Sequence, residues 1–147
     1  MQKSTICSII LVLVLSSFFS PAAAMAKDDL SGTYFESAMR QMINRGWIGG
    51  YEDGSYRPKN PVTRAEFTSM LVRVFELTEQ KGQAKSFKDV KKGKWYYHPI
   101  QVASSHNLIG GYDDGTFRPN NKINRQEMAA MVLRAMKKQG VTTGEQP

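Results

Sequence analysis

The chain has 147 residues, with 20 lysines and arginines against 13 aspartates and glutamates, and a formal net charge of +7. These charges are spread along the sequence, so a long basic tail is excluded. Cys7 is the only cysteine and the chain has 2 histidines. The composition therefore excludes an intrachain disulfide and argues against a multi-histidine zinc centre. We expect no metal site and no cofactor.

Residues 1–26 are predicted to be a secretory signal peptide. Lys3 provides a positive start, residues 9–15 form an unbroken apolar run, and two overlapping small-x-small sites follow at residues 22–26. The apolar segment is shorter than the roughly 20 residues that a membrane-spanning helix needs. We expect cleavage after Ala24 or Ala26, which also removes Cys7, and a mature protein that is exported and has no membrane contact.

The rest of the chain contains an internal repeat. Residues 48–60 read IGGYEDGSYRPKN, and residues 109–121 read IGGYDDGTFRPNN, so that Tyr112 follows Tyr51 by 61 positions. The similarity continues at the same offset through the next segment of each copy. We divide the mature chain into a first repeat (27–78), a polar linker (79–86), a second repeat (87–140) and a short flexible tail (141–147).

Each repeat is predicted to be a helix, a loop and a second helix. Apolar residues recur at helical spacing over residues 34–43, and Gly46 is a natural helix stop. The second helices begin with capping boxes, formed by Thr63 with Glu66 and by Asn124 with Glu127. Their apolar stripes indicate core packing. We expect an all-α fold in which tandem helix–loop–helix repeats pack as a small helical bundle, with Trp95 in the core.

The loop between the helices is dense in turn-forming residues. Asp53-Gly54 and Asp114-Gly115 indicate tight turns, and the prolines after Arg57 and Arg118 favour extended backbone at those arginines. An EF-hand-type calcium loop requires ligands at several alternate positions and a closing glutamate, which this loop lacks. Ahead of the first helix of each repeat, Asp28 aligns with Asp89 at the offset of 61.

The order of these motifs resembles the S-layer homology (SLH) repeat family. The motifs are Phe-x-Asp and an aromatic residue, Gly-Tyr-x-Asp-Gly-x-aromatic-Arg-Pro, and Thr-Arg-x-Glu followed by an apolar helix, and residues 87–138 follow them almost throughout. The resemblance implies an all-helical module that binds secondary cell-wall polysaccharide, typically pyruvylated, without a covalent bond at the bacterial surface. It also implies that three repeats usually share one bundle, with ligand grooves between neighbours. This sequence shows two repeats.

Arg64 and Arg125 are predicted to stand at the first helical position, where the helix dipole disfavours a cation. We interpret them as exposed residues of an anion pocket, in which free helix amides and a guanidinium hold a carboxylate. The alternative is a surface arginine paired with a neighbouring carboxylate. Tyr51 and Tyr112 either stack on sugars or are buried. The candidate glycan-binding residues come from the loop and the helix start of both repeats: Tyr51, Asp53, Gly54, Arg57, Arg64, Tyr112, Asp114, Gly115, Arg118 and Arg125.

No nucleophile with its base and no pair of poised carboxylates stands out, so we expect a non-catalytic protein. A nucleic-acid partner is not expected, because the sequence lacks a clustered basic stripe with interleaved aromatic residues. We predict a secreted wall-binding protein at the cell surface. The alternative is a surface assembly subunit that keeps the SLH fold without binding glycan.

Two repeats leave an apolar edge open, because repeat modules commonly need about three units for a closed core. We expect the edge to be covered by a second copy or by another SLH protein. The alternative is a closed monomer in which the first helix, with Tyr34 and Phe35, folds over the edge.

Overall fold

The structure is a computed structural model that describes residues 28–81 and 83–141. The predicted signal peptide and all but the first residue of the predicted tail lie outside the described residues. The described part contains four helices: α1 (Glu36–Asn44), α2 (Arg64–Val74), α3 (Tyr97–Ser105) and α4 (Arg125–Lys138). The all-α prediction is confirmed. None of these helices has both the length and the apolar character that crossing a membrane requires.

The helices repeat as the sequence does. At the offset of 61, α3 begins where α1 does and α4 begins where α2 does. Both predicted capping boxes are present: the Thr63 side chain accepts from the Glu66 amide and the Glu66 carboxylate accepts from the Thr63 amide, with Asn124 and Glu127 repeating the pattern. These local signals fix where the second helix of each repeat begins.

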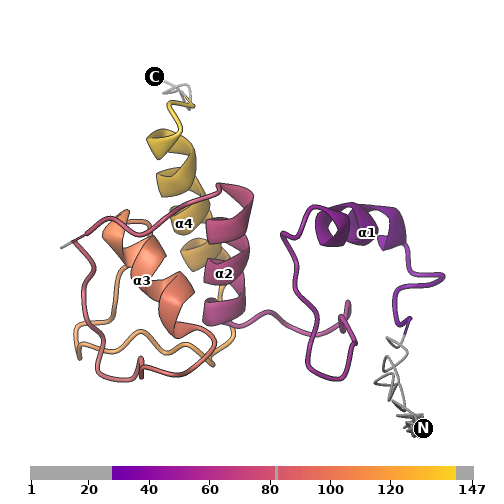
Figure 1. The fold of residues 1–147 in the computed structure, drawn as a ribbon, viewed down its shortest axis with the longest axis horizontal. Helices are drawn as coiled ribbons and strands as arrows, with labels where there is room; N and C mark the ends of the chain where they lie inside the picture. The colour runs from indigo at the N-terminus through magenta and orange to yellow at the C-terminus, as the bar shows by residue number, and fades with distance from the viewer. Residues whose placement is uncertain (1–27, 82, 142–147) are drawn as a thin grey trace, which may run out of the picture.

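The core does not follow the repeat boundary. The second helix of the first repeat, α2, packs against α3 of the second repeat and also contacts α4. Figure 1 shows these three helices together, with α1 set apart from them. Ile100, Leu108 and Phe117 are fully buried at the centre of this three-helix body. The bundle therefore consists of the second repeat together with the second helix of the first.

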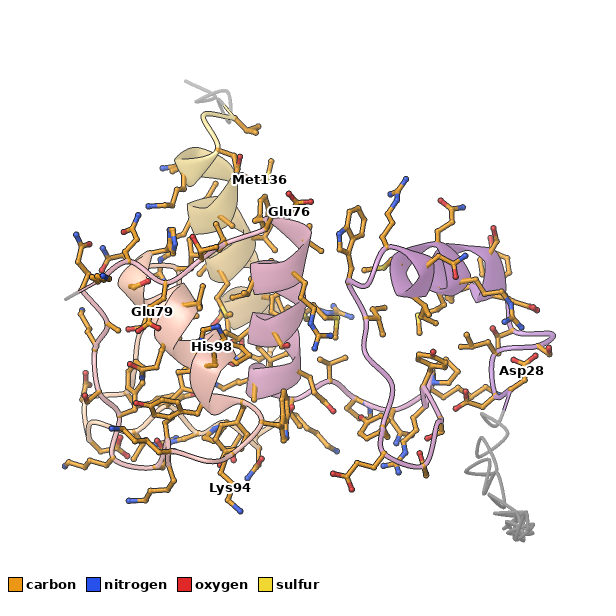
Figure 2. All side chains as sticks on the ribbon, in the orientation of Figure 1. Asp28, Glu76, Glu79, Lys94, His98 and Met136 are labelled. Carbon is orange, nitrogen blue, oxygen red and sulfur yellow. The ribbon has the colours of Figure 1, made fainter. Side chains whose placement is uncertain are left out.

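Within the described residues, α1 contacts no other helix and has no buried residue. Tyr34 is 93% exposed and Phe35 is 65% exposed, so the expected alternative of a first helix folded over the open edge is wrong. The start of α1 is held locally, because Arg40 donates to Asp28 and Glu36. Figure 2 shows Asp28 on the α1 side of the molecule, away from α3.

The segment expected to be a linker runs along α3. The amide of Gln80 donates to the Ser105 hydroxyl oxygen at 3.1 Å, and the amide of Lys85 donates to the Ser104 hydroxyl oxygen at 2.9 Å. Both serines are buried. The connection between the repeats thus supplies hydrogen-bond donors that satisfy buried polar side chains of α3.

Candidate functional site

The two interhelical loops have the same internal hydrogen bonds. One carboxylate oxygen of Asp53 accepts from the amide and the hydroxyl of Ser55, and the other accepts from Arg57 at 3.0 Å. The Arg57 guanidinium lies 3.9 Å from the centre of the Tyr51 ring. Hydrogen bonds from Ser55 and then from Arg57 lower the pKa of Asp53 to about 2. The aspartate and arginine of this loop are therefore engaged with each other.

The second loop repeats this arrangement with Thr116 in place of serine. Asp114 accepts from the amide and the hydroxyl of Thr116 and from Arg118 at 3.0 Å, and the Arg118 guanidinium lies 3.9 Å from the Tyr112 ring centre. The pKa of Asp114 is lowered to about 2, first by the Thr116 hydroxyl. Gly54 and Gly115 have φ values of 77° and 78°, as the predicted turns require.

The prediction of extended backbone before the prolines is wrong. Arg57 has φ 49° and Arg118 has φ 59°, both in the left-handed region. In the second repeat the cause is Asp89, whose carboxylate accepts from the amides of Phe117 and Arg118 at 2.8 and 2.7 Å. Two consecutive amides can reach one carboxylate only if the chain turns at this point. The carboxylate thus overrides the preference of a residue that precedes proline.

Asp29 has the same role in the first repeat, accepting from the amides of Tyr56 and Arg57. The alignment of Asp28 with Asp89 is therefore wrong by one residue, because Asp28 instead accepts from Ser31 and Arg40. The segment between this aspartate and the first helix is one residue shorter in the first repeat than in the second, so an alignment at a constant offset pairs the wrong aspartates.

Arg64 is buried rather than exposed, with 5% of its surface accessible. Its Nε donates to the Phe117 carbonyl at 2.8 Å, and its Nη1 lies 2.9 Å from Oε1 of Glu127. Its Nη2 donates to the Gly110 carbonyl at 3.3 Å. Arg64 thus joins α2 of the first repeat to the loop and to α4 of the second.

The interpretation of free amides at the start of α2 is also wrong. The amides of Arg64 and Ala65 donate to the carbonyls of Asn121 and Pro119, at 2.9 and 3.0 Å, and the Glu66 amide is capped by Thr63. Arg125, at the same position of α4, is exposed, and its guanidinium has no partner among the described residues. The two predicted arginines therefore differ completely in environment.

Two hollows lie at equivalent places in the two repeats. The smaller has a volume of about 210 Å³, and the larger, which we call the first-repeat groove, has a volume of about 960 Å³. Both are bounded by the Gly-Gly-Tyr segment, the capping glutamate and an arginine of the second helix. In the first-repeat groove these residues are Gly49, Gly50, Tyr51, Glu66 and Arg73. In the smaller hollow they are Gly110, Gly111, Tyr112, Glu127 and Arg134. The smaller hollow also contains Arg64 in its wall.

The capping glutamates belong to these walls. Glu66 Oε1 accepts from the Tyr51 hydroxyl at 2.6 Å, and Glu127 Oε1 accepts from the Tyr112 hydroxyl at 2.6 Å. Burial raises the pKa of Glu66, but hydrogen bonds from Tyr51 and Thr63 outweigh it and hold the pKa below its ordinary value. Each glutamate therefore stays charged, caps its helix and orients a tyrosine at the rim of the groove.

The structure corrects one aromatic prediction and places two others. Trp95, expected in the core, is 59% exposed and lines the first-repeat groove. Of the two tyrosines left open between stacking and burial, Tyr51 is exposed and Tyr112 is half-buried. Sequence reasoning also missed Arg73, which lines the first-repeat groove without a partner in the described part of the chain. The presence of an arginine at the equivalent position of the second repeat, Arg134, is the sequence signal that could have identified it.

Comparison with known proteins connects this geometry with a family. The sequence matches the S-layer homology domain family over residues 28–68 and 86–129, which together make up more than half of the chain. The chain belongs to the S-layer homology domain family. The matched ranges begin just ahead of the loop-holding aspartates and end within the second helices, so they leave out Arg73 and Arg134, which line the two hollows.

The relatives are much longer proteins. The chain is 34% identical to an amylopullulanase of Thermoanaerobacterium thermosulfurigenes over 82% of its own length and 7% of the relative. It is 28% identical to a surface layer protein of Brevibacillus choshinensis, over 86% of the chain and 12% of the relative. It is 34% identical to a cellulosome-anchoring protein of Acetivibrio thermocellus, over 64% of the chain and 22% of the relative. The chain thus spans a small part of each.

Proposed function

We propose that this chain is a secreted, non-catalytic anchoring module that binds secondary cell-wall polysaccharide at the cell surface, and that a pyruvylated glycan is its ligand. The observation that carries the proposal is the first-repeat groove of this SLH family member, which combines exposed aromatic rings with the guanidinium of Arg73, without a partner among the described residues. Relatives described as a surface layer protein and as a cellulosome-anchoring protein support the location at the surface.

The groove has the chemistry that an acidic sugar requires. The exposed ring of Trp95, and the face of the Tyr51 ring that Arg57 does not cover, offer apolar surfaces on which pyranose rings can stack. Arg73 offers a planar guanidinium that can hold a carboxylate, such as that of a pyruvyl ketal, through two hydrogen bonds. The volume of about 960 Å³ is at the upper end of the range for small-ligand sites, which suits a segment of a polymer.

The remaining predicted residues act mainly as a frame in this proposal. Asp53 and Arg57 hold each other and support the ring of Tyr51, and Asp114, Arg118 and Tyr112 do so in the second repeat. Gly54 and Gly115 form the turns. Among the predicted arginines, Arg125 is exposed and its guanidinium has no partner among the described residues, whereas Arg64 forms part of the wall of the smaller hollow.

The test is retention of the secreted chain on purified cell walls, before and after chemical removal of pyruvyl groups. Trp95→Ala and Arg73→Ala are expected to lower retention by about tenfold each, as the loss of a stacking or charged contact does. The matched controls are Tyr34→Ala, an exposed aromatic residue away from the groove lining, and Arg45→Ala. Equal retention of all four variants would refute the assignment of the groove.

Removal of pyruvyl groups tests the ligand separately from the site. If the chain is retained equally on depyruvylated walls, the ligand is not the pyruvyl ketal. If it is not retained on any wall, the surface assembly alternative takes precedence over glycan binding.

A further inference from the structure

We propose that a second copy of this chain docks its α4 against α1 and inserts Arg125 into the first-repeat groove, where it pairs with Glu66. The inference rests on the packing of the described residues and on charge complementarity, and the docking does not require a bound glycan. The partner copy would contribute to the first repeat the arginine that the second repeat receives from α2.

The contact between α2 and α3 is the template. By the repeat offset, α1 corresponds to α3 and α4 corresponds to α2. In this structure α2 covers α3, whereas α1 is not covered by any helix of the described residues. The surface that α3 buries against α2 therefore has a counterpart on α1 that is open, and the helix suited to cover it is one equivalent to α2.

The exposed side chains agree with this equivalence. Tyr96, at the start of α3, is 7% exposed, and its counterpart Phe35 is 65% exposed. Ile100 and Ala103 are fully buried, whereas their counterparts Met39 and Met42 are half-buried and line the first-repeat groove. Large apolar side chains thus stand at the positions where α3 forms its interface, and covering them would remove apolar surface from water.

The matching face of α4 is open as well. Ala65 and Thr68 of α2 are fully buried, but their counterparts Gln126 and Ala129 of α4 are exposed. Leu133, on the same face one turn further along, is also exposed. The small side chain of Ala129 allows another helix to approach α4 closely. The small side chain of Thr68 has the same effect where α2 meets α3.

The charges at the interface are complementary. In the second repeat, Glu127 Oε1 accepts from the Tyr112 hydroxyl and pairs with Arg64. In the first repeat, Glu66 Oε1 accepts from the Tyr51 hydroxyl in the same way, but no arginine of the described residues forms an ion pair with it. Arg125 is the counterpart of Arg64 and is unpaired among the described residues. Glu66 therefore lacks the cation that Arg64 provides to Glu127, and Arg125 is the arginine at the equivalent position that can supply it.

The backbone groups show the same complementarity. The amides of Arg64 and Ala65 donate to the carbonyls of Asn121 and Pro119. The equivalent amides of Arg125 and Gln126 have no acceptor in the part of the chain that the structure describes. The equivalent carbonyls belong to Asn60 and Pro58, and both residues line the first-repeat groove. Docking would satisfy these helix amides, which need acceptors when they are buried.

Every copy carries both halves of this contact, so two copies can each give α4 and receive it in a closed pair. The second copy would cover the part of the first-repeat groove lined by Met39, Met42, Pro58, Asn60 and Glu66. In the second repeat, where Arg64 already stands at that place, a hollow of about 210 Å³ persists. Association would therefore reshape the first-repeat groove and leave the rest of it open to a ligand.

The first experiment is sedimentation of the secreted chain at micromolar concentration in buffer without glycan, where a dimer is expected. Arg125→Glu places a negative charge against Glu66 and is expected to raise the dimer Kd by about tenfold or more. Lys138→Glu makes the same charge change at the far end of α4 and is the matched control, expected to dimerise as the unaltered chain does. A purely monomeric unaltered chain would overturn the proposal, as would a dimer that is indifferent to Arg125→Glu.

A mixing experiment tests the head-to-tail geometry. Met42→Arg obstructs the receiving face on α1, and Ala129→Arg obstructs the donating face on α4. Each variant alone is expected to sediment as a folded monomer, with its helicity checked by circular dichroism. Their equimolar mixture is expected to form a heterodimer, because the intact α4 of one meets the intact α1 of the other. A mixture that stays monomeric, or either variant dimerising alone as well as the unaltered chain, would overturn this arrangement.

Discussion

Arg64 and Glu127 form an ion pair of 2.9 Å between the first turns of α2 and α4, although 63 positions separate them in the sequence. Arg64 is also held by two carbonyls of the second loop. This pair joins the two repeats at the point where the smaller hollow lies. Its position makes Arg64 a determinant of stability, whereas the sequence had favoured an exposed arginine.

We expect Arg64→Ala to lower the free energy of unfolding by about 3 kcal/mol, the low end for breaking a buried ion pair, because Glu127 keeps its other partners. Arg125→Ala is expected to change it by less than about 0.5 kcal/mol, since that side chain is exposed. Urea unfolding of both variants below the concentration at which the chain associates provides the comparison. Equal stabilities would show that Arg64 does not hold the repeats together.

The two capping glutamates are expected to differ in their contribution to stability. Glu66→Ala removes half of a capping box and should cost about 1 kcal/mol. Glu127→Ala removes the same bonds and also leaves the Arg64 guanidinium buried without its carboxylate, so we expect about 3 kcal/mol. Thermal unfolding followed by circular dichroism measures both. The prediction is contradicted if Glu66→Ala is the more destabilising change.

Features that depend on neighbouring residues could be predicted from the sequence. The capping boxes, the Asp-Gly turns and the first helical position of Arg64 and Arg125 each follow from a few consecutive side chains. The repeat itself correctly indicated that both halves of the chain fold alike. The family assignment used the same short motifs.

Features that depend on which repeat packs against which could not be predicted in this way. Nothing near Arg64 indicates that α2 crosses to α3 and that its guanidinium is buried in the second loop. Trp95 is 59% exposed at the groove, with its ring against that of the buried Tyr96, although tryptophan in an aromatic cluster usually indicates burial. The shift from Asp28 to Asp29 is visible only in the hydrogen bonds of the loop.

Adjacent glycines of the second loop provide a matched pair of substitutions. A Cβ on Gly111 would lie 2.9 Å from the Thr116 carbonyl oxygen and 2.7 Å from the Phe87 ring, whereas a Cβ on Gly110 meets nothing within 4 Å. Thr116 cannot move away, because its carbonyl accepts from the Tyr112 amide at 2.8 Å. We expect Gly111→Ala to destabilise the chain by about 1–3 kcal/mol, as overpacking does, and Gly110→Ala to be nearly neutral. Similar melting temperatures for the two would show that the loop is not packed tightly here.

The loops are expected to loosen in acid. The pKa values of Asp53 and Asp114 are lowered from 3.8 to about 2, chiefly by hydrogen bonds from the Ser55 and Thr116 side chains. A carboxylate whose pKa is lower in the folded state binds its proton more readily when the chain unfolds, so its contribution to stability is complete above about pH 4 and is lost as the pH falls toward 2. Both groups are exposed, so salt should weaken the effect.

Hydrogen exchange at the amides of Ser55 and Thr116, which donate to these carboxylates, measures the loosening locally, after correction for the intrinsic pH dependence of exchange. Protection of both amides should fall between pH 4 and pH 2. Asp114→Asn should remove most of this dependence at Thr116 and leave it at Ser55, which serves as the internal control. Protection that stays constant at both amides down to pH 2, while the helices remain folded, would show that the charged form of the aspartates does not hold the loops.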